Sequence, residues 1–186
     1  EAFQVIYNLL NWEEIEAGEG YHPTFFEYMF FIAMLVFKEA TPDYCILETG
    51  LGGRLDATNA VSRKELCVIT HLSLEHTEYL GNTLEAIAGE KAGIMAEHTP
   101  VVFWDTAAET TSVIAKKAKQ LSAQCYPVSK KDYVLLKIKN KIIDFSYISR
   151  YDYNIRINLN TIAQYQMENS SLALRAIEVL DQERQI

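Results

Sequence analysis

The sequence predicts an α/β fold in which a mostly parallel sheet is flanked by helices and followed by a small antiparallel β meander. Short β-rich segments alternate with segments of helical period, which is the pattern of βαβ units. The predicted strands of the first part are apolar on both faces, as central parallel strands are. After Tyr133 the strand-like segments follow one another without helices, which indicates the meander. We therefore expect a Rossmann-like layer with a lateral antiparallel sheet.

The first predicted helix spans residues 22–40, "HPTFFEYMFFIAMLVFKEA". Its side chains are apolar on every face, which is typical of a helix buried in a core. Thr24 is the predicted N-cap, and Glu27, three residues further on, is its capping-box partner. The twenty residues at the start include "NWEEIEAGEG" and are acidic, so we expect them to form a loop across the surface.

The remaining elements follow from the same periodicities. Strands of the parallel sheet are predicted at 44–48, 66–72 and 99–104. Helices are predicted within 80–97, with Asn82 or Thr83 as N-cap, and at 106–124. The meander is predicted as a hairpin around "KNK", starting at Tyr133, and a third strand at 153–160. A last helix over 165–182 is apolar at Leu172, Leu174, Ile177 and Leu180.

Composition excludes several classes of protein. The net charge of −8 argues against a dedicated nucleic-acid binder, which depends on Lys and Arg to neutralise phosphates. The longest apolar run, residues 28–37, is too short to span a bilayer, and no signal-peptide pattern is present. Cys45, Cys67 and Cys125 are odd in number and widely spaced, and two lie in predicted strands. We expect buried, reduced thiols in a cytoplasmic, monomeric protein without membrane or nucleic-acid partners.

The segment "ETGLGGRLDATN", residues 48–59, places a carboxylate where a predicted buried strand gives way to a glycine-rich turn. In open α/β sheets, ligands bind outside the carboxyl ends of the strands. His76 follows the next predicted strand in the same relative place as Glu48. If the two strands are neighbours, both side chains point into one crevice, where Mg²⁺ accepts oxygen ligands and one histidine is an unusual addition. Taken alone, His76 also fits a surface histidine near a helix start.

Lys91 lies on a predicted apolar helix among small residues, Ala88, Ala92 and Gly93. A lysine in such surroundings usually extends to solvent. The alternative is a desolvated lysine that is modified or meets a phosphate. The residues by themselves leave both interpretations open.

Four segments together resemble one family: "TFFEYMFFIAMLVF", "ETGLGGRLDATN", "ITHLSLEHTEYLGNTLEAIAGEKAGI" and "QMENSSLAL". They are similar to the folylpolyglutamate synthase/dihydrofolate synthase family, the folate branch of the Mur-ligase-like ATP-dependent amide ligases. The resemblance runs from about Thr24 to Ala176 and implies a Mur-ligase central domain. It implies an enzyme that activates a carboxylate of folate or dihydropteroate as an acyl phosphate. The amine of L-glutamate then attacks, giving an amide, ADP and phosphate.

The resemblance also implies roles for individual residues. Glu48 and His76 are expected to hold Mg²⁺, and Lys91 is expected to be carbamylated. Desolvation by small apolar neighbours favours the neutral amine that reacts with CO₂. Asn169 is expected to contact the adenine of ATP, with Gln166 one turn before it, because an amide offers both a donor and an acceptor.

The glycine turn has expected roles at the substrate. Gly50, Gly52 and Gly53 would let backbone approach the substrate closely. Arg54 and Asp56 are expected to line the same place.

The chain departs from the family pattern at three positions. Glu75 stands where the family usually has Asp before the metal histidine, which lengthens the side chain. Ala163 and Tyr165 replace the Gly and His that normally precede Gln166 in the late helix motif. These changes leave a direct role of Glu75, and adenine contacts beyond Asn169, unassigned.

No G-x-x-x-x-G-K-[ST] phosphate loop is found, and the nearest Gly-rich stretch, "GEGYHPT", lacks the lysine. We expect residues 1–186 to be a partial Mur-ligase-type central ATP-binding domain, without its P-loop segment and without the C-terminal glutamate-ligase domain. On this interpretation the 186-residue chain does not ligate by itself.

Other functions fit parts of the pattern. A UDP-muramyl-peptide ligase shares the fold and the metal and lysine chemistry. A nucleotide-sensing or NAD-binding Rossmann domain fits less well, since "GLGGRLDATN" lacks the third glycine and an immediate helix. A non-catalytic nucleotide-binding relic is the third alternative, and the reading frame upstream of Glu1 would distinguish it from the enzyme.

Overall fold

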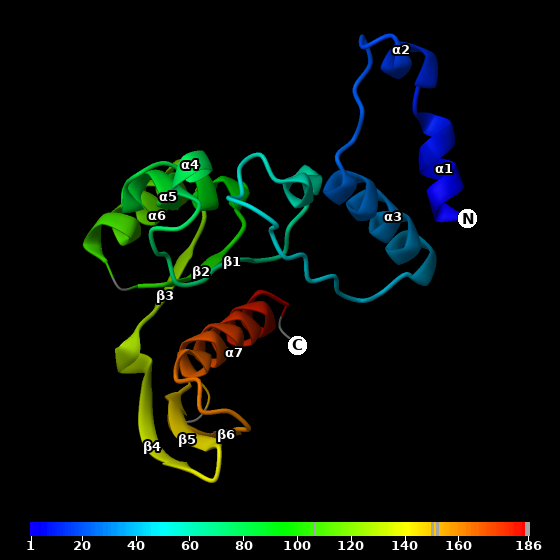
Figure 1. Ribbon diagram of the computed structural model, residues 1–186. Helices are drawn as coiled ribbons and strands as arrows, with labels where there is room; N and C mark the ends of the chain where they lie inside the picture. The colour runs from blue at the N-terminus through cyan, green and yellow to red at the C-terminus, as the bar shows by residue number, and fades with distance from the viewer. Residues whose placement is uncertain (106, 150, 152, 185–186) are drawn as a thin grey trace. The chain divides into compact units, whose positions relative to one another are not determined.

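The computed structural model describes residues 1–105, 107–149, 151 and 153–184. The chain divides into two compact units, which are described separately (Figure 1). Unit 1 comprises residues 1–51 and 55–60, and unit 2 comprises residues 52–54 and 61–186. Within the described residues, no helix combines the length and apolarity needed to cross a membrane.

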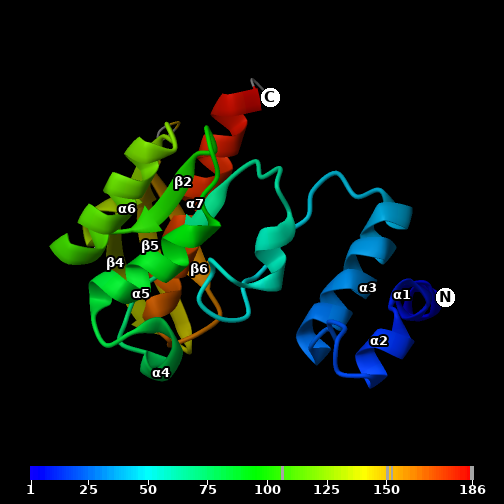
Figure 2. The same cartoon turned by 90° about the horizontal axis from the view of Figure 1, so that it is seen from above.

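Unit 1 is helical. It contains α1 (Ala2–Leu9), α2 (Trp12–Glu16), α3 (Phe25–Ala40) and the 3₁₀ helix η1 (Ala57–Ala60), and α1 packs beside α3 (Figure 2). The predicted capping box of α3 is confirmed. Thr24 Oγ1 accepts a hydrogen bond from the backbone N–H of Glu27 at 3.3 Å, and the Glu27 carboxylate accepts one from the N–H of Thr24 at 2.8 Å.

The expected loop over the first twenty residues is wrong, because most of that segment forms α1 and α2. Asn11 caps α2 by accepting a hydrogen bond from the N–H of Glu14. Aromatic contacts hold the segment: the Tyr7 and Trp12 rings lie 4.5 Å apart, and the Phe3 ring lies 5.2 Å from that of Tyr28 on α3. The prediction rested on the acidic composition of this segment and did not take these aromatic contacts into account.

Two further predictions for unit 1 are wrong. Residues 44–48 form no strand; Ile46 is 96% exposed and Cys45 is also exposed. The helix α3 is apolar all round as predicted, yet none of its side chains is buried. Few elements surround it in this small unit, so apolarity did not translate into burial.

Unit 2 is built on a parallel sheet of order β1-β2-β3, formed by Cys67–Ile69, Val101–Trp104 and Cys125–Val128. The predicted strands at 66–72 and 99–104 are confirmed, in shorter form. The strand β3 was not predicted, because Pro127 lies within it and proline argues against a central strand. Because β3 is at the edge of the sheet, one side of the strand has no neighbour, and a proline that faces this side removes no hydrogen bond between strands.

Cys67 and Cys125 lie in these strands, and burial raises the pKa of both thiols.

Helices cover both faces of this sheet. On one face, α5 (Leu84–Lys91) and α6 (Ala108–Gln120) pack through Ala88 and Ile114 (Figure 1). Short α4 (Thr77–Leu80) precedes α5, and η2 (Ala92–Ile94) follows it. Thr83 caps α5, as predicted. The predicted start of α6, Thr106, lies outside the described residues.

The antiparallel sheet near the C-terminus is confirmed, with order β4-β5-β6. Its strands are Tyr133–Lys139, Ile142–Ile148 and Tyr153–Leu159, preceded by η3 (Lys130–Asp132). The hairpin predicted around "KNK" is confirmed, and its turn consists of Asn140 and Lys141 with φ of 51° and 62°, the left-handed backbone that two-residue hairpin turns require.

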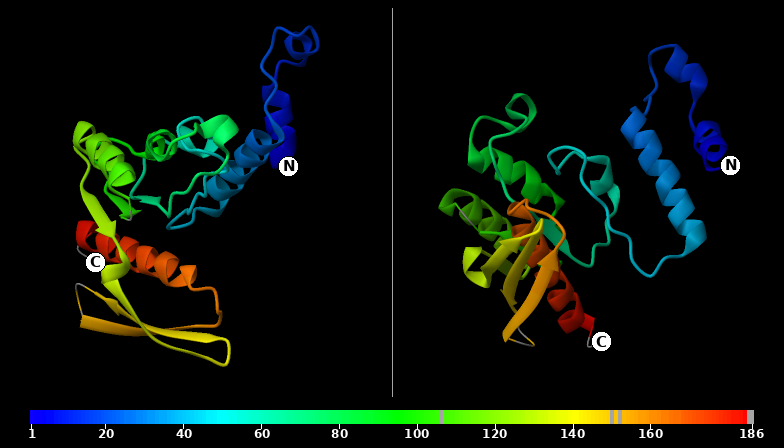
Figure 3. Two further views of the ribbon diagram at one scale, coloured as in Figure 1. Left: turned by 60° about the vertical axis from the view of Figure 1, so that its left-hand side comes forward. Right: turned by 60° about the horizontal axis from the view of Figure 1, so that its bottom comes forward.

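The helix α7 (Tyr165–Arg184) lies between the two sheets (Figure 3). Leu172 and Val179 pack against the parallel sheet, and Met167 packs against the antiparallel sheet. Of the predicted apolar positions, Leu172 is buried and Ile177 is 63% exposed. Unit 2 therefore has four layers: α5 and α6, the parallel sheet, α7, and the antiparallel sheet.

A buried polar network fixes α7 to its neighbours. The Glu178 carboxylate accepts hydrogen bonds from Tyr147 at 3.1 Å and from Ser149 at 2.6 Å. Arg175 lies 3.2 Å from the same carboxylate, donates to Tyr147 Oη at 3.0 Å and pairs with Asp132 at 3.1 Å. Burial raises the pKa of Tyr147 to about 12, although Arg175 acts in the opposite direction. The network links η3, β5 and α7.

We predict that Glu178→Gln lowers the free energy of unfolding by about 3 kcal/mol, because it removes one partner of a buried ion pair and leaves Arg175 undercompensated. Thermal and urea unfolding of unit 2 measure this loss. Ile177→Ala, on the exposed face of the same helix, is the control and should change stability by less than about 0.5 kcal/mol. Equal effects of the two variants would show that the network does not stabilise the fold.

Candidate functional site

The motif at residues 48–59 is divided between the two units. Within unit 1, Asp56 organises the turn: one carboxylate oxygen accepts from the N–H groups of Gly50 and Leu51, at 3.0 and 3.1 Å. The other oxygen accepts from Thr58, at 2.9 Å from the N–H and 2.6 Å from the hydroxyl. Burial alone would raise the pKa of Asp56, but these hydrogen bonds outweigh it and hold the pKa below its ordinary value. Asp56 is therefore occupied in holding the turn.

Glu48 also belongs to unit 1, where its side chain is exposed. Its predicted approach to His76 would join the two units and stays a prediction. Gly50 lies close to Phe26, since a Cβ added there would come within 2.9 Å of the ring.

The other glycines of the motif belong to unit 2, where Gly52 lies against Leu80 of α4 and Gly53 lies against the end of α5. Gly52 has φ of 67°, which favours glycine. A Cβ at Gly53 would come within 2.9 Å of the carbonyl oxygen of Glu90. The N–H of Arg54 donates to that same carbonyl at 3.0 Å, and its guanidinium pairs with the Glu90 carboxylate at 3.1 Å. These predicted substrate residues thus have packing roles of their own.

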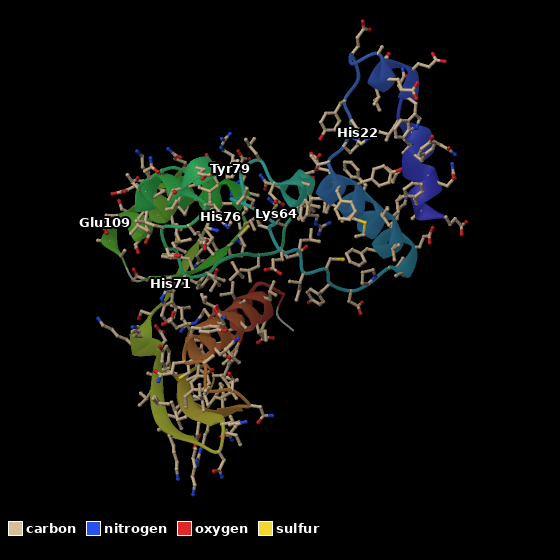
Figure 4. The ribbon with its side chains drawn as sticks, in the orientation of Figure 1. His22, Lys64, His71, His76, Tyr79 and Glu109 are labelled. Atoms are coloured by element: carbon tan, nitrogen blue, oxygen red, sulfur yellow. The ribbon has the colours of Figure 1, made fainter. Side chains whose placement is uncertain are left out.

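In unit 2, the loop after β1 places Glu75 beside Lys91 of α5. Lys91 Nζ lies 3.3 Å from Glu75 Oε1, with side chains 25% and 45% exposed. His76 follows Glu75 and occupies the N-cap position of α4 without a side-chain capping hydrogen bond (Figure 4). Its backbone is left-handed with φ of 47°, a conformation that six other non-glycine residues of the described chain share. Sequence reasoning left Glu75 without a role, although its position directly before His76 is the signal that would have placed it here.

These groups fit a divalent cation only if Lys91 is modified. Among the described residues, no group of three or more His, Cys, Asp and Glu side chains is placed to hold a metal. The ammonium of Lys91 beside Glu75 repels a cation, whereas a carbamate at Lys91 would place two anionic oxygen groups side by side. With His76, that donor set would suit Mg²⁺, which prefers oxygen ligands.

The first turn of α7 carries the predicted adenine residues. Asn169 Nδ2 donates to Gln166 Oε1 at 3.5 Å, so the structure brings the two amides together. Glu168 lies between them in sequence and pairs with His71, which follows β1 (Figure 4). Neither His71 nor Glu168 was given a role from the sequence, although both lie inside the segments that carry the family resemblance, because their contact joins residues far apart in the chain.

We predict that Asp56→Ala increases amide hydrogen exchange in residues 49–59 about tenfold, because it removes hydrogen bonds to a charged acceptor. Asp56→Asn keeps one acceptor oxygen, so its exchange rate should lie between those of the wild-type protein and of Asp56→Ala. Because the folded pKa of Asp56 is lowered, its contribution is present above the unfolded value of about 3.8 and is lost as pH falls through the folded value. Unchanged exchange in Asp56→Ala would remove this role.

Comparison with known proteins identifies the family. The Mur ligase middle domain matches residues 7–177. The chain belongs to the Mur ligase middle domain family. This confirms the predicted fold class.

Two curated relatives of this Mur ligase middle domain are named dihydrofolate synthase/folylpolyglutamate synthase. The one from Bacillus subtilis is 36% identical over 176 residues, which cover 92% of this chain and 40% of the relative. The one from Haemophilus influenzae is 56% identical over 79 residues, which cover 42% of this chain and 18% of the relative. The predicted resemblance is thus confirmed, and the chain spans less than half the length of these relatives.

Solved structures agree with this assignment. A folylpolyglutamate synthase from Thermotoga maritima matches with a TM-score of 0.79 and 30% identity, covering 96% of this chain and 40% of that chain. An FPGS–AMPPCP–folate complex matches with a TM-score of 0.85, covering 99% of this chain and 45% of that chain. At 24% identity, the second likeness shows the fold alone.

Proposed function

We propose that the chain is the central ATP-binding part of a ligase that joins L-glutamate to folate or dihydropteroate. The observation that carries this proposal is membership of the Mur ligase middle domain family together with the names of the similar enzymes. An FPGS of the same fold binds AMPPCP and folate, as its name states, which supports ATP and a folate as ligands here. L-glutamate and a monomeric state belong to the same proposal.

Within unit 2, we assign the chemistry to the loop after β1 and to the end of α5. His76 would hold Mg²⁺, with Glu48 as the carboxylate ligand contributed by unit 1. When bound, Mg²⁺ supplies charge that stabilises a transferring phosphoryl group. The position of His76 supports its role, because it lies between the carboxyl end of β1 and α4, at the edge of the sheet where ligands of open α/β folds bind.

Lys91 and Glu75 form a coupled pair in this proposal. The Lys91 ammonium first loses one proton to give the neutral amine, and the reaction of this amine with CO₂ then forms the carbamate and releases a second proton to solvent. The local charge then changes from a neutral ion pair to two adjacent anions, which favours a bound cation. The modification and the metal would therefore support one another.

Gln166 and Asn169 are assigned to the adenine base. Their mutual hydrogen bond keeps both amides on one side of α7. The amide of Asn169, which is exposed, has a free acceptor and a second donor for the base edge.

The test is ADP release by the full-length gene product with Mg²⁺-ATP, L-glutamate and either dihydropteroate or a reduced folate. We expect turnover that depends on the pterin, and a loss of at least about 100-fold in kcat for His76→Ala and Lys91→Ala. The control is His98→Asn, an exposed histidine whose left-handed backbone Asn tolerates, and it should keep full activity.

Other outcomes would replace the proposal. Turnover with a UDP-muramyl acceptor alone would assign the chain to the cell-wall branch of the family. No turnover with any acceptor would contradict the ligase assignment and favour a non-catalytic relic.

A further inference from the structure

We propose that His71 and Glu168 form a positioning pair for nucleotide binding, which holds the first turn of α7 against the end of β1. This inference rests on the proposed function, because it concerns the turn that carries Gln166 and Asn169. It assigns a role to two residues to which the sequence gave none.

The pair joins two elements at one edge of the parallel sheet. Glu168 Oε2 lies 3.6 Å from His71 Nδ1. The Glu168 side chain is only 17% exposed, whereas that of His71 is 53% exposed. His71 follows the last residue of β1 by two positions, so it lies beyond the carboxyl end of that strand. Ligands of open α/β sheets bind outside this edge.

The other side of the turn is already fixed by apolar contact. Met167 is 4% exposed and packs against β5 of the antiparallel sheet. Burial, together with the charge of Glu168, raises the pKa of Tyr133, so the carboxylate also faces the start of β4. The helix dipole stabilises a carboxylate near a helix N-terminus, as Glu168 is on α7. His71, on the opposite side of the contact, would then fix the direction of this carboxylate. The turn is thus held from both sides.

The pair also connects the two predicted parts of the site within unit 2. His71 begins the loop that leads to Glu75 and His76. Glu168 lies between Gln166 and Asn169 on α7. If the contact between His71 and Glu168 were broken, the amides of Gln166 and Asn169 would move away from the loop. Nucleotide binding would then weaken, although the reacting groups themselves would be unchanged.

The experiment uses the full-length gene product and a fluorescent ATP analogue with Mg²⁺. We expect His71→Gln and Glu168→Gln each to raise the dissociation constant two- to fivefold, the range for a partly exposed ion pair. The double variant should be no weaker than either single variant, because both remove one interaction. The KM for ATP should rise in parallel, while kcat and the midpoint of thermal unfolding stay unchanged.

A second measurement does not depend on a ligand. Hydrogen exchange of residues 163–170 without nucleotide should accelerate in both single variants and not in the His98→Asn control. Unchanged exchange and unchanged affinity, or fully additive effects in the double variant, would overturn the positioning role. If the wild-type protein binds no nucleotide, the proposed function fails, whereas the exchange result still decides whether the pair holds the turn.

Discussion

The architecture of unit 2 depends on the burial of one helix between two sheets. The helix α7 contributes Leu172 and Val179 to the core of the parallel sheet and Met167 to that of the antiparallel sheet. A helix with two apolar faces can slide or rotate, because apolar contacts lack direction. The hydrogen bonds and ion pairs of Glu178 and Arg175 have direction, and they allow only one arrangement. We regard this network as the constraint that fixes the four layers.

This constraint also has a functional consequence. The start of α7 lies near the edge of the parallel sheet where β1 ends and where the loop that leads to His76 begins. We propose that the buried anchor in the middle of the helix and the contact between His71 and Glu168 at its first turn keep the predicted adenine residues in place. Such positioning matters because the catalysis of phosphoryl transfer depends mainly on the orientation of the reacting groups and on electrostatic stabilisation of the transferred phosphoryl group.

The sequence predicted those features that arise from local patterns. The capping box of Thr24, the "KNK" turn and the alternation of strands and helices all depend on neighbouring residues, and each is found. The strand at 44–48 and the burial of α3 depend on partners distant in the chain, so apolarity alone misled. Glu75 and Lys91 are 16 positions apart in the sequence, and His71 and Glu168 are 97 positions apart. No local sequence pattern predicts contacts between residues so far apart.

We expect one site at the carboxyl edge of the parallel sheet to bind both the nucleotide and the metal. A crystal structure of the full-length gene product with Mg²⁺, a non-hydrolysable ATP analogue and folate tests it most directly. We expect the adenine within hydrogen-bond distance of Asn169, a carbamate on Lys91, and Mg²⁺ coordinated by His76 and Glu48 at about 2.1 Å. A nucleotide bound elsewhere, with an unmodified Lys91 still paired to Glu75, would contradict the account.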